Sequence, residues 1–361
     1  MKMTFRWYGE KDSIPLEYIR QIPNVQSVVT AVYDVPVGEV WSDASVKKLR
    51  DLAAAKGLKA EVIESIPVHE DIKLGRGDRD RYIANYCENI RVVARNGVKC
   101  VCYNFMPVFD WLRTEMAHPN PDYSTSLAYS RDDFQKIDPT NLHLPGWDES
   151  YTPEELQGLL KAYKDISHEK LFENFVYFLE RVIPVCEETG VVMAVHPDDP
   201  PWDVFGLPRI VSCEEDLDRL FAAVPSKCNG LTLCTGSLGA GRKNDLVHMA
   251  AKYAAQGRVH FAHLRNVLWT DDADSFCEVG HCSSYGSLDM AAIVRALAEN
   301  GFDGYVRPDH GRSIFGETGK GGYGLYDRAL GAAYLNGLFE ATEKDLKKKA
   351  ETKPIYVELR V

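Results

Sequence analysis

The chain has 361 residues, of which 45% are hydrophobic and 26% charged, and its formal net charge is −11. This composition is typical of a globular protein, and the length suits one α/β barrel with insertions. The acidic balance argues against a nucleic-acid-binding surface. A signal peptide and a membrane span would each need an apolar run that the sequence lacks. We therefore expect a cytoplasmic protein with reduced cysteines and with neither nucleic-acid nor membrane partners.

Strand-like and helix-like runs alternate in the first part of the chain. Strands are predicted at residues 4–9, 27–31, 59–65 and 98–105. Helices are predicted at residues 13–22, 43–56 and 80–96. Gly57 and Gly97 follow the second and third of these helices, where glycine commonly ends a helix. Alternation of this kind favours a parallel sheet with helical crossovers.

The alternation breaks in a segment of about residues 110–168. Its first part is rich in Asp, Pro, Asn, Thr and Tyr, and helices at 153–166 and 169–189 follow. Because the segment comes after the fourth strand, it belongs at the end of a barrel that carries active-site loops. We expect this insertion to cover the substrate as a lid; a decorative or oligomer-forming insertion is the alternative.

The second half of the chain supplies four more strands and four more helices. The strands are predicted at 191–196, 231–234, 259–263 and 305–309, and the helices at 214–223, 245–256, 288–300 and 326–340. With the insertion's own helix at 153–166 set aside, eight strands alternate with eight helices, which predicts a single (β/α)8 TIM barrel over residues 1–340. Residues 341–361 are expected to form a C-terminal tail, with a Lys/Glu-rich linker before a short β-like run at 355–361.

Each strand of the second half ends in a good metal ligand. These ligands are His196, Cys234, His263 and Asp309. The C-terminal ends of parallel barrel strands meet at one mouth, so the four side chains should converge. Two imidazoles, a thiolate and a carboxylate favour a transition metal, with Mn²⁺, Fe²⁺, Co²⁺, Zn²⁺ and Ni²⁺ all possible. Any one of them alone would be read as a core residue; their coincidence predicts a catalytic metal site.

Two residues beside Asp309 are candidates for chemistry at the same mouth. Arg307 could bind a substrate carboxylate in bidentate fashion, and His310 is a candidate general acid or base. His260 should face the opposite way from His263 and is interpreted as structural. The Gly-rich stretches at 236–241 and 316–324 do not match a Walker motif. Both are predicted to be flexible active-site loops, and the second carries Tyr323 as a possible proton donor.

Polar and aromatic residues end the first and fourth strands. They include Arg6, Trp7, Asn104 and Asp110, which suit a polyhydroxylated ligand that needs hydrogen bonds and a flat apolar surface. Core packing is the competing explanation for the tryptophan.

Seven short motifs, in order along the chain, resemble those of the mannonate dehydratase family. They are TFRWYG (4–9), YNFMP (103–107), AVHPDDPP (194–201), LCTGS (233–237), FAHLRN (261–266), RPDHG (307–311) and GYGLYD (322–327). The resemblance implies a barrel similar to xylose isomerase and the removal of water from D-mannonate to give 2-keto-3-deoxy-D-gluconate, a step of hexuronate (glucuronate) breakdown.

The resemblance also implies roles for individual residues. His196, Cys234, His263 and Asp309 would hold one divalent metal, Mn²⁺ or Fe²⁺, with Co²⁺ possible. His310 and Tyr323 would have acid–base or substrate roles near Arg307, although Tyr326 competes with Tyr323. A metal-dependent sugar isomerase or epimerase and a non-catalytic sugar-acid-binding protein stay open as alternatives; a metal-dependent endonuclease fits an acidic chain poorly. The tail and the insertion make a homodimer plausible.

Overall fold

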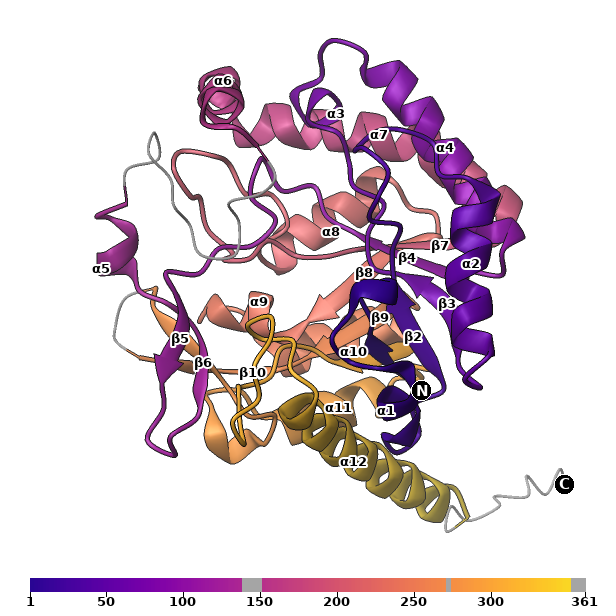
Figure 1. Ribbon diagram of the computed structural model, residues 1–361, viewed down its shortest axis with the longest axis vertical. Helices are drawn as coiled ribbons and strands as arrows, with labels where there is room; N and C mark the ends of the chain where they lie inside the picture. Colours follow the sequence, from indigo (N-terminus) through magenta and orange to yellow (C-terminus); the bar gives the residue numbers. More distant parts are fainter. Residues whose placement is uncertain (138–150, 271–273, 352–361) are drawn as a thin grey trace, which may run out of the picture.

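The computed structural model, which describes residues 1–137, 151–270 and 274–351, is a closed barrel of eight parallel strands surrounded by helices (Figure 1). The strands are β1 (Lys2–Arg6), β2 (Ser27–Thr30), β3 (Lys59–Ile63), β4 (Cys100–Tyr103), β7 (Val192–Val195), β8 (Asn229–Cys234), β9 (Val259–Leu264) and β12 (Tyr305–Pro308). β1 pairs with both β12 and β2, which closes the barrel. The predicted (β/α)8 fold is confirmed.

Amphipathic helices cover the outside of the barrel. They include α1 (Leu16–Gln21), α2 (Asp43–Ala54), α4 (Arg79–Arg95), α7 (His168–Thr189), α8 (Glu214–Ala223), α10 (Leu246–Ala255) and α11 (Met290–Glu299). In α11 the buried residues Met290, Ile293, Val294 and Leu297 recur at the spacing of one helical face. Asp289 caps that helix by accepting the Ala292 N–H. Sequence periodicity therefore determines which face of each helix packs on the sheet.

The last helix, α12 (Tyr326–Glu351), is longer than the sequence predicts. The linker expected from residue 341 is helical as far as Glu351, so that prediction is wrong for this part of the tail. Glu, Lys and Ala dominate the extension and are all good helix formers, and Glu340 forms an i,i+4 ion pair with Lys344. The predicted β-like run at 355–361 lies outside the described residues.

A second, four-stranded antiparallel sheet was not predicted. It contains β5 (Glu115–Pro119), β6 (Thr125–Tyr129), β10 (Asn266–Trp269) and β11 (Phe276–Val279), in the order β10-β11-β6-β5. The predicted insertion after the fourth strand is confirmed and supplies β5 and β6, then α5 (Arg131–Phe134) and α6 (Pro153–Tyr163); its residues 138–150 are outside the described part. Because β10 and β11 come from the segment after β9, pairing of β11 with β6 joins two distant loops over the barrel (Figure 1).

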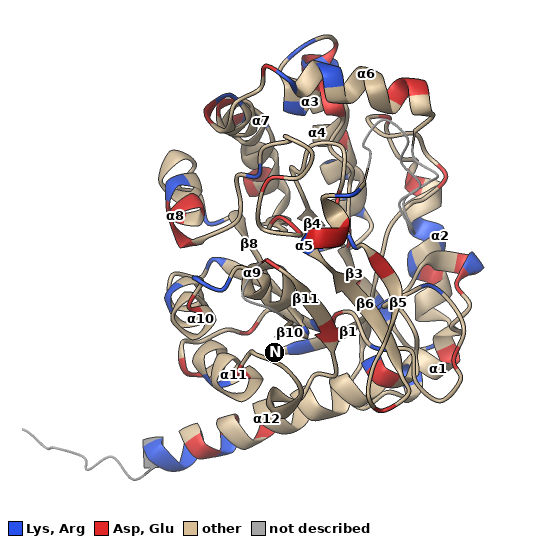
Figure 2. Cartoon of the chain, turned by 90° about the vertical axis from the view of Figure 1, so that its left-hand side faces the viewer, with Lys and Arg blue, Asp and Glu red and all other residues tan. Residues whose placement is uncertain are grey.

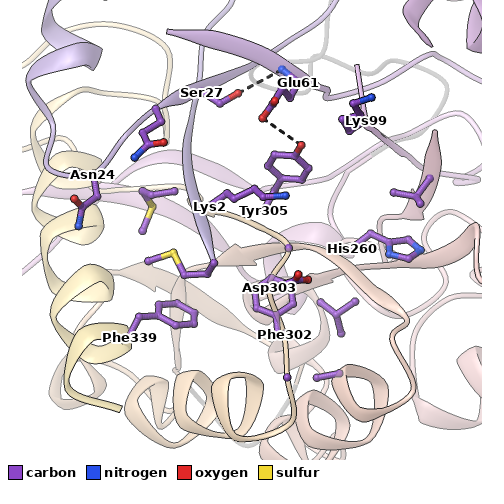
Figure 3. Close-up of a pocket in the computed structure, with 18 of the residues that line it drawn as sticks. Lys2, Asn24, Ser27, Glu61, Lys99, His260, Phe302, Asp303, Tyr305 and Phe339 are labelled. Atoms are coloured by element: carbon purple, nitrogen blue, oxygen red, sulfur yellow. Dashed lines mark hydrogen bonds between the residues drawn. The ribbon is translucent and has the colours of Figure 1, made fainter. Parts of the chain in front are cut away.

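The barrel has a cavity of about 900 Å³ at the amino-terminal ends of its strands (Figure 3). Lys2, Ser27 and Tyr305, which begin three of the strands, line it together with Glu61 and His260. His260 thus faces away from His263, as predicted. Barrel enzymes place their chemistry at the opposite, carboxyl-terminal end. The size of this cavity is therefore no guide to the active site.

The surface carries both signs of charge. Figure 2 shows Lys and Arg interspersed with Asp and Glu along the outer helices, α8, α10 and α12 among them. Among the described residues, no helix is long and apolar enough to cross a membrane.

Candidate metal centre and acid–base pair

The candidate metal ligands stand at one level of the barrel. Cys234 at the end of β8 is paired with His263 of β9, and the His196 N–H donates to the Tyr103 carbonyl at 2.6 Å. Asp309 directly follows β12, the other neighbour of β9. The donor atoms of His196, Cys234 and His263 lie within 4.8 Å of one another. The structure therefore brings together side chains that are far apart in the sequence.

Hydrogen bonds orient both imidazoles as metal ligands. The His196 Nδ1 lies 2.7 Å from the Pro197 carbonyl and so donates to it, which leaves the lone pair on Nε2. Burial disfavours the charged form of His196, but Cys234 outweighs burial and raises the pKa of His196 to about 9. The metal-free His196 is therefore protonated at neutral pH and would lose its Nε2 proton on binding a metal. Burial and the nearby Arg307 lower the pKa of His263 well below its usual value, so this imidazole is neutral, as a ligand must be.

The Cys234 sulfur receives hydrogen bonds that favour a thiolate. The Ser237 hydroxyl donates to Sγ at 3.0 Å, and the Arg265 guanidinium lies 3.9 Å from Sγ. Sγ also lies 3.6 Å from Oδ2 of Asp309, which places the carboxylate beside the three donors described above.

The segment that carries Ser237 is a buried helix, α9 (Thr235–Ala240). The prediction of a flexible loop at residues 236–241 is therefore wrong. Gly236 has a packing role in this helix, because a Cβ there would lie 2.3 Å from Nε of Arg265. The glycine lets the guanidinium approach Cys234.

Asp309 is held in its ionised form by two arginines. Arg307 Nη2 lies 2.7 Å from Oδ1, and Arg265 Nε lies 2.9 Å from Oδ2. Burial alone would raise the pKa of Asp309, but Arg307 and His310 outweigh it and hold the pKa well below its usual value. An ionised carboxylate has about four lone-pair positions, so two guanidinium contacts leave room for a metal. The set of two imidazoles, one thiolate and one carboxylate fits a divalent transition metal.

His310 and Tyr323 form a hydrogen-bonded pair at the same mouth. The His310 Nδ1 lies 2.9 and 3.0 Å from the two oxygens of Glu278, which can only accept, so Nδ1 donates. Nε2 therefore accepts from the Tyr323 hydroxyl at 3.0 Å. Burial and the neighbouring Tyr8 raise the pKa of Tyr323 well above its usual value, which keeps the phenol protonated. Tyr326 is 47% exposed, so the tyrosine beside His310 is Tyr323.

Glu278 belongs to a buried network of alternating charges. Arg113 lies 2.8 Å from Asp199 and 2.6 Å from Glu278, and Arg265 lies 2.7 and 2.5 Å from the same two carboxylates. Burial alone would raise the pKa of Glu278, but Arg265 and His310 lower it to about 2. Because each desolvated charge has partners of opposite sign, the cost of burial is offset and Glu278 is fixed in one orientation.

Arg6 and Trp7, both predicted to bind substrate, differ in their surroundings. Arg6 is the last residue of β1 and Trp7 follows it. Arg6 is buried, its Nε and Nη1 have no hydrogen-bond partner among the described residues, and its guanidinium lies 4.5 Å from the Tyr8 ring. Burial disfavours its charge, but Tyr33 and nearby anionic groups outweigh burial and raise the pKa of Arg6. Trp7 is part of the main hydrophobic core with Phe5, which favours the packing role weighed above.

Asn104 and Asp110 line a cavity of about 760 Å³. Its described lining also includes His69, Glu70 and Tyr151, and none of the four candidate ligands. Asn104 and Asp110 therefore line the same cavity, but the candidate metal ligands do not line it.

Several buried charged residues of the site escaped the sequence-based prediction. They are Arg113, Asp199, Arg265 and Glu278, together with the half-buried Glu64. Three of these carried a signal, because Glu64, Asp199 and Arg265 follow strands β3, β7 and β9 as the candidate ligands do. Arg113 and Glu278 carried none, since Glu278 lies on β11 of the sheet that was not predicted and Arg113 lies in the segment just before β5.

Comparisons with known proteins identify the family of this chain. The family model of D-mannonate dehydratase (UxuA) matches residues 1–349. The mannonate dehydratases of Streptococcus uberis and of Streptococcus agalactiae serotype III are each 52% identical over 349 residues, which cover 96% of this chain and 100% of each relative.

Solved structures give the same result. The crystal structure of mannonate dehydratase from Streptococcus suis serotype 2 superposes with a TM-score of 0.89 at 46% identity, covering 96% of each chain. A xylose isomerase-like TIM barrel protein from Mycobacterium smegmatis, at a TM-score of 0.54, 14% identity and coverage of 91% of this chain and 87% of the other, shares the fold alone. The resemblance inferred from the seven motifs is confirmed, and the chain belongs to the D-mannonate dehydratase family.

Proposed function

We propose that this chain removes water from D-mannonate to give 2-keto-3-deoxy-D-gluconate at the centre described above. The observation that carries the proposal is the His310–Tyr323 hydrogen bond directly beside the candidate ligand cluster. Dehydration needs a base for the C2 proton and an acid for the departing C3 hydroxyl, and this pair supplies one of each.

The proposed metal ligands are His196, Cys234, His263 and Asp309, and the proposed metal is Mn²⁺ or Fe²⁺, with Co²⁺ as a further candidate. When bound, such a cation would stabilise the negative charge that develops on the substrate oxygens. Arg265 and Arg307 hold the Asp309 carboxylate in place for it.

His310 is the proposed base and Tyr323 the proposed acid. Nε2 of His310 carries the lone pair, because Nδ1 donates to Glu278. Nε2 takes the C2 proton, the C–H electrons form the C2–C3 double bond, and the C3 hydroxyl leaves with the phenolic proton of Tyr323. The enol then becomes the 2-keto product. The same 3.0 Å contact lets His310 return a proton to the Tyr323 oxygen, which resets the pair.

The substrate is an anionic, polyhydroxylated sugar acid, and Arg6 and Arg307 are proposed to bind it. Both guanidinium groups are buried and keep nitrogens that have no hydrogen-bond partner in the described part of the chain. Such donors suit a carboxylate. Asn104 and Asp110 are proposed to bind substrate from the second cavity, whereas Trp7 is assigned to packing. The homodimer remains a prediction.

The rival enzyme class is a sugar isomerase or epimerase. L-ribulose 3-epimerase matches at 12% identity with a TM-score of 0.54, so the likeness extends to the fold alone. The family shown above favours dehydration.

A substrate panel tests the proposal against both alternatives. We expect protein loaded with Mn²⁺ to form the 2-keto-3-deoxy acid from D-mannonate and to leave aldose–ketose pairs unchanged, as measured by chromatography of products. Interconversion of a sugar pair without action on D-mannonate would identify an isomerase. Binding of D-mannonate without turnover of any substrate would identify a binding protein.

A further inference from the structure

Glu64 is a half-buried carboxylate, outside the ligand set, whose buried Oε2 faces a proposed metal ligand. It directly follows β3, where its N–H donates to the Thr30 carbonyl at 2.9 Å. One carboxylate oxygen, Oε1, accepts from Arg307 Nη2 at 3.0 Å. The other, Oε2, is buried without a hydrogen-bond partner among the described residues and lies 3.9 Å from Nε2 of His263.

The contacts of His263 determine which of its nitrogens carries the proton. Its Nδ1 lies 3.2 Å from Arg307 Nη2, and a guanidinium can only donate, so Nδ1 carries the lone pair. Nδ1 also faces Asp309, with Oδ1 at 3.9 Å, so the lone pair lies on the side of the ligand cluster, and Arg307 would have to release it to a bound metal. In a neutral imidazole the proton then sits on Nε2, which faces Glu64.

We propose that Glu64 is a positioning residue for His263: its Oε2 accepts the Nε2 proton and so keeps the Nδ1 lone pair available to the metal. The inference rests on the proposed metal site. A movement of about 1 Å would bring the 3.9 Å separation to hydrogen-bond length. Carboxylate–histidine–metal triads of this kind orient the ring, and loss of the outer partner typically costs about 10- to 100-fold in metal affinity.

A direct metal-binding role for Glu64 is the main alternative. Glu64, Cys102 and His263 offer donor atoms within 4.8 Å of one another. Cys102, however, belongs to the small apolar cluster of the barrel interior, and burial raises the pKa of its thiol. Its contact is a hydrogen bond from the Thr232 hydroxyl at 3.3 Å, whereas Cys234 has both Ser237 and Arg265 beside its sulfur. Cys234 is therefore the better-placed sulfur ligand.

Glu64→Gln is a sharp test because the amide has one acceptor and one donor end. Arg307 requires the oxygen, so the NH2 group would face Nε2 of His263 and favour the wrong tautomer. We expect Mn²⁺ affinity, measured from the EPR signal of free Mn²⁺, to fall by about 10- to 100-fold. Glu61→Gln is the matched control, since Glu61 lies on the same strand but lines the cavity at the opposite end of the barrel (Figure 3). Its affinity should equal that of the wild type.

Two further measurements decide between the roles. ¹⁵N-histidine NMR of the metal-free proteins should show the Nε2–H form of His263 in the wild type and the Nδ1–H form in Glu64→Gln. The variant saturated with Co²⁺ should keep the wild-type absorption spectrum, because its ligands are unchanged. Wild-type Mn²⁺ affinity and tautomer in Glu64→Gln, or an altered Co²⁺ spectrum, would overturn the positioning role. If Cys234→Ser binds Mn²⁺ as tightly as the wild type, the metal site itself is misassigned.

Discussion

Replacing His310 with Asn is expected to leave metal binding unchanged and to lower kcat for D-mannonate by about 10²- to 10⁴-fold. The amide can keep a hydrogen bond to Glu278 but cannot accept the C2 proton or return one to Tyr323. Steady-state kinetics at saturating Mn²⁺, with metal content measured on the same sample, would check this.

His248→Asn is a suitable control for the loss of an imidazole. The His248 side chain is 58% exposed and lies 3.3 Å from Glu214, on the helices outside the barrel. We expect this variant to retain the wild-type kcat. Wild-type turnover by His310→Asn would contradict the role given to His310, and loss of metal in that variant would indicate a structural role instead.

Replacing Cys234 with Ser is expected to weaken Mn²⁺ binding by more than about 100-fold. This loss exceeds the effect that is typical when a residue hydrogen-bonded to a metal ligand is replaced. A serine hydroxyl stays protonated at neutral pH and is a poor ligand, whereas Ser237 and Arg265 are placed to stabilise a thiolate at this position. The absorption band that a thiolate gives with Co²⁺ should disappear, and turnover at micromolar metal should be lost.

Cys228→Ser provides the matched control for this variant. Cys228 immediately precedes β8, so it lies at the opposite end of the strand that ends in Cys234. Its thiol is partly exposed, and its replacement should change neither the Co²⁺ band nor the affinity for Mn²⁺. Retention of the Co²⁺ band by Cys234→Ser would remove this cysteine from the proposed ligand set.

The barrel and the proximity of the candidate ligands could be predicted from the sequence because both depend on local patterns. A buried parallel strand is a short apolar run, and a ligand at its end, such as His263, is placed by the strand itself. The pairing of Cys234 with His263 then follows from closing the barrel. Choosing between Tyr323 and Tyr326 needed the structure, since burial and the hydrogen bond to His310 distinguish them.

Long-range pairing accounts for most of what the sequence did not reveal. The sheet β10-β11-β6-β5 joins segments more than a hundred residues apart, and no local pattern announces such a partner. Glu278 reaches His310 only because that sheet forms. The same limit applies to α9, where a Gly-rich stretch indicated a loop and the packing of Arg265 against Gly236 stabilises a helix instead.

The second sheet contributes to the His310–Tyr323 pair, because Glu278, which accepts a hydrogen bond from His310, lies on β11 of that sheet. Asp199 and Arg265 come from loops after barrel strands, whereas Arg113 and Glu278 come from the segments that form the second sheet. Their ion pairs connect the barrel mouth to that sheet. The pairing of β6 with β11 therefore fixes the position of Glu278. Glu278 in turn keeps the His310 proton on Nδ1.

The most direct test of the account is an add-back experiment on metal-stripped protein. D-mannonate would be supplied anaerobically with Mn²⁺, Fe²⁺, Co²⁺, Zn²⁺ or Mg²⁺ in turn, and both bound metal and the 2-keto-3-deoxy acid would be measured. We predict no product without metal and recovery of turnover with Mn²⁺ or Fe²⁺, at about one bound ion per chain. Undiminished turnover by the metal-free protein, or no product with any metal from folded protein, would contradict the proposed metal-dependent dehydration.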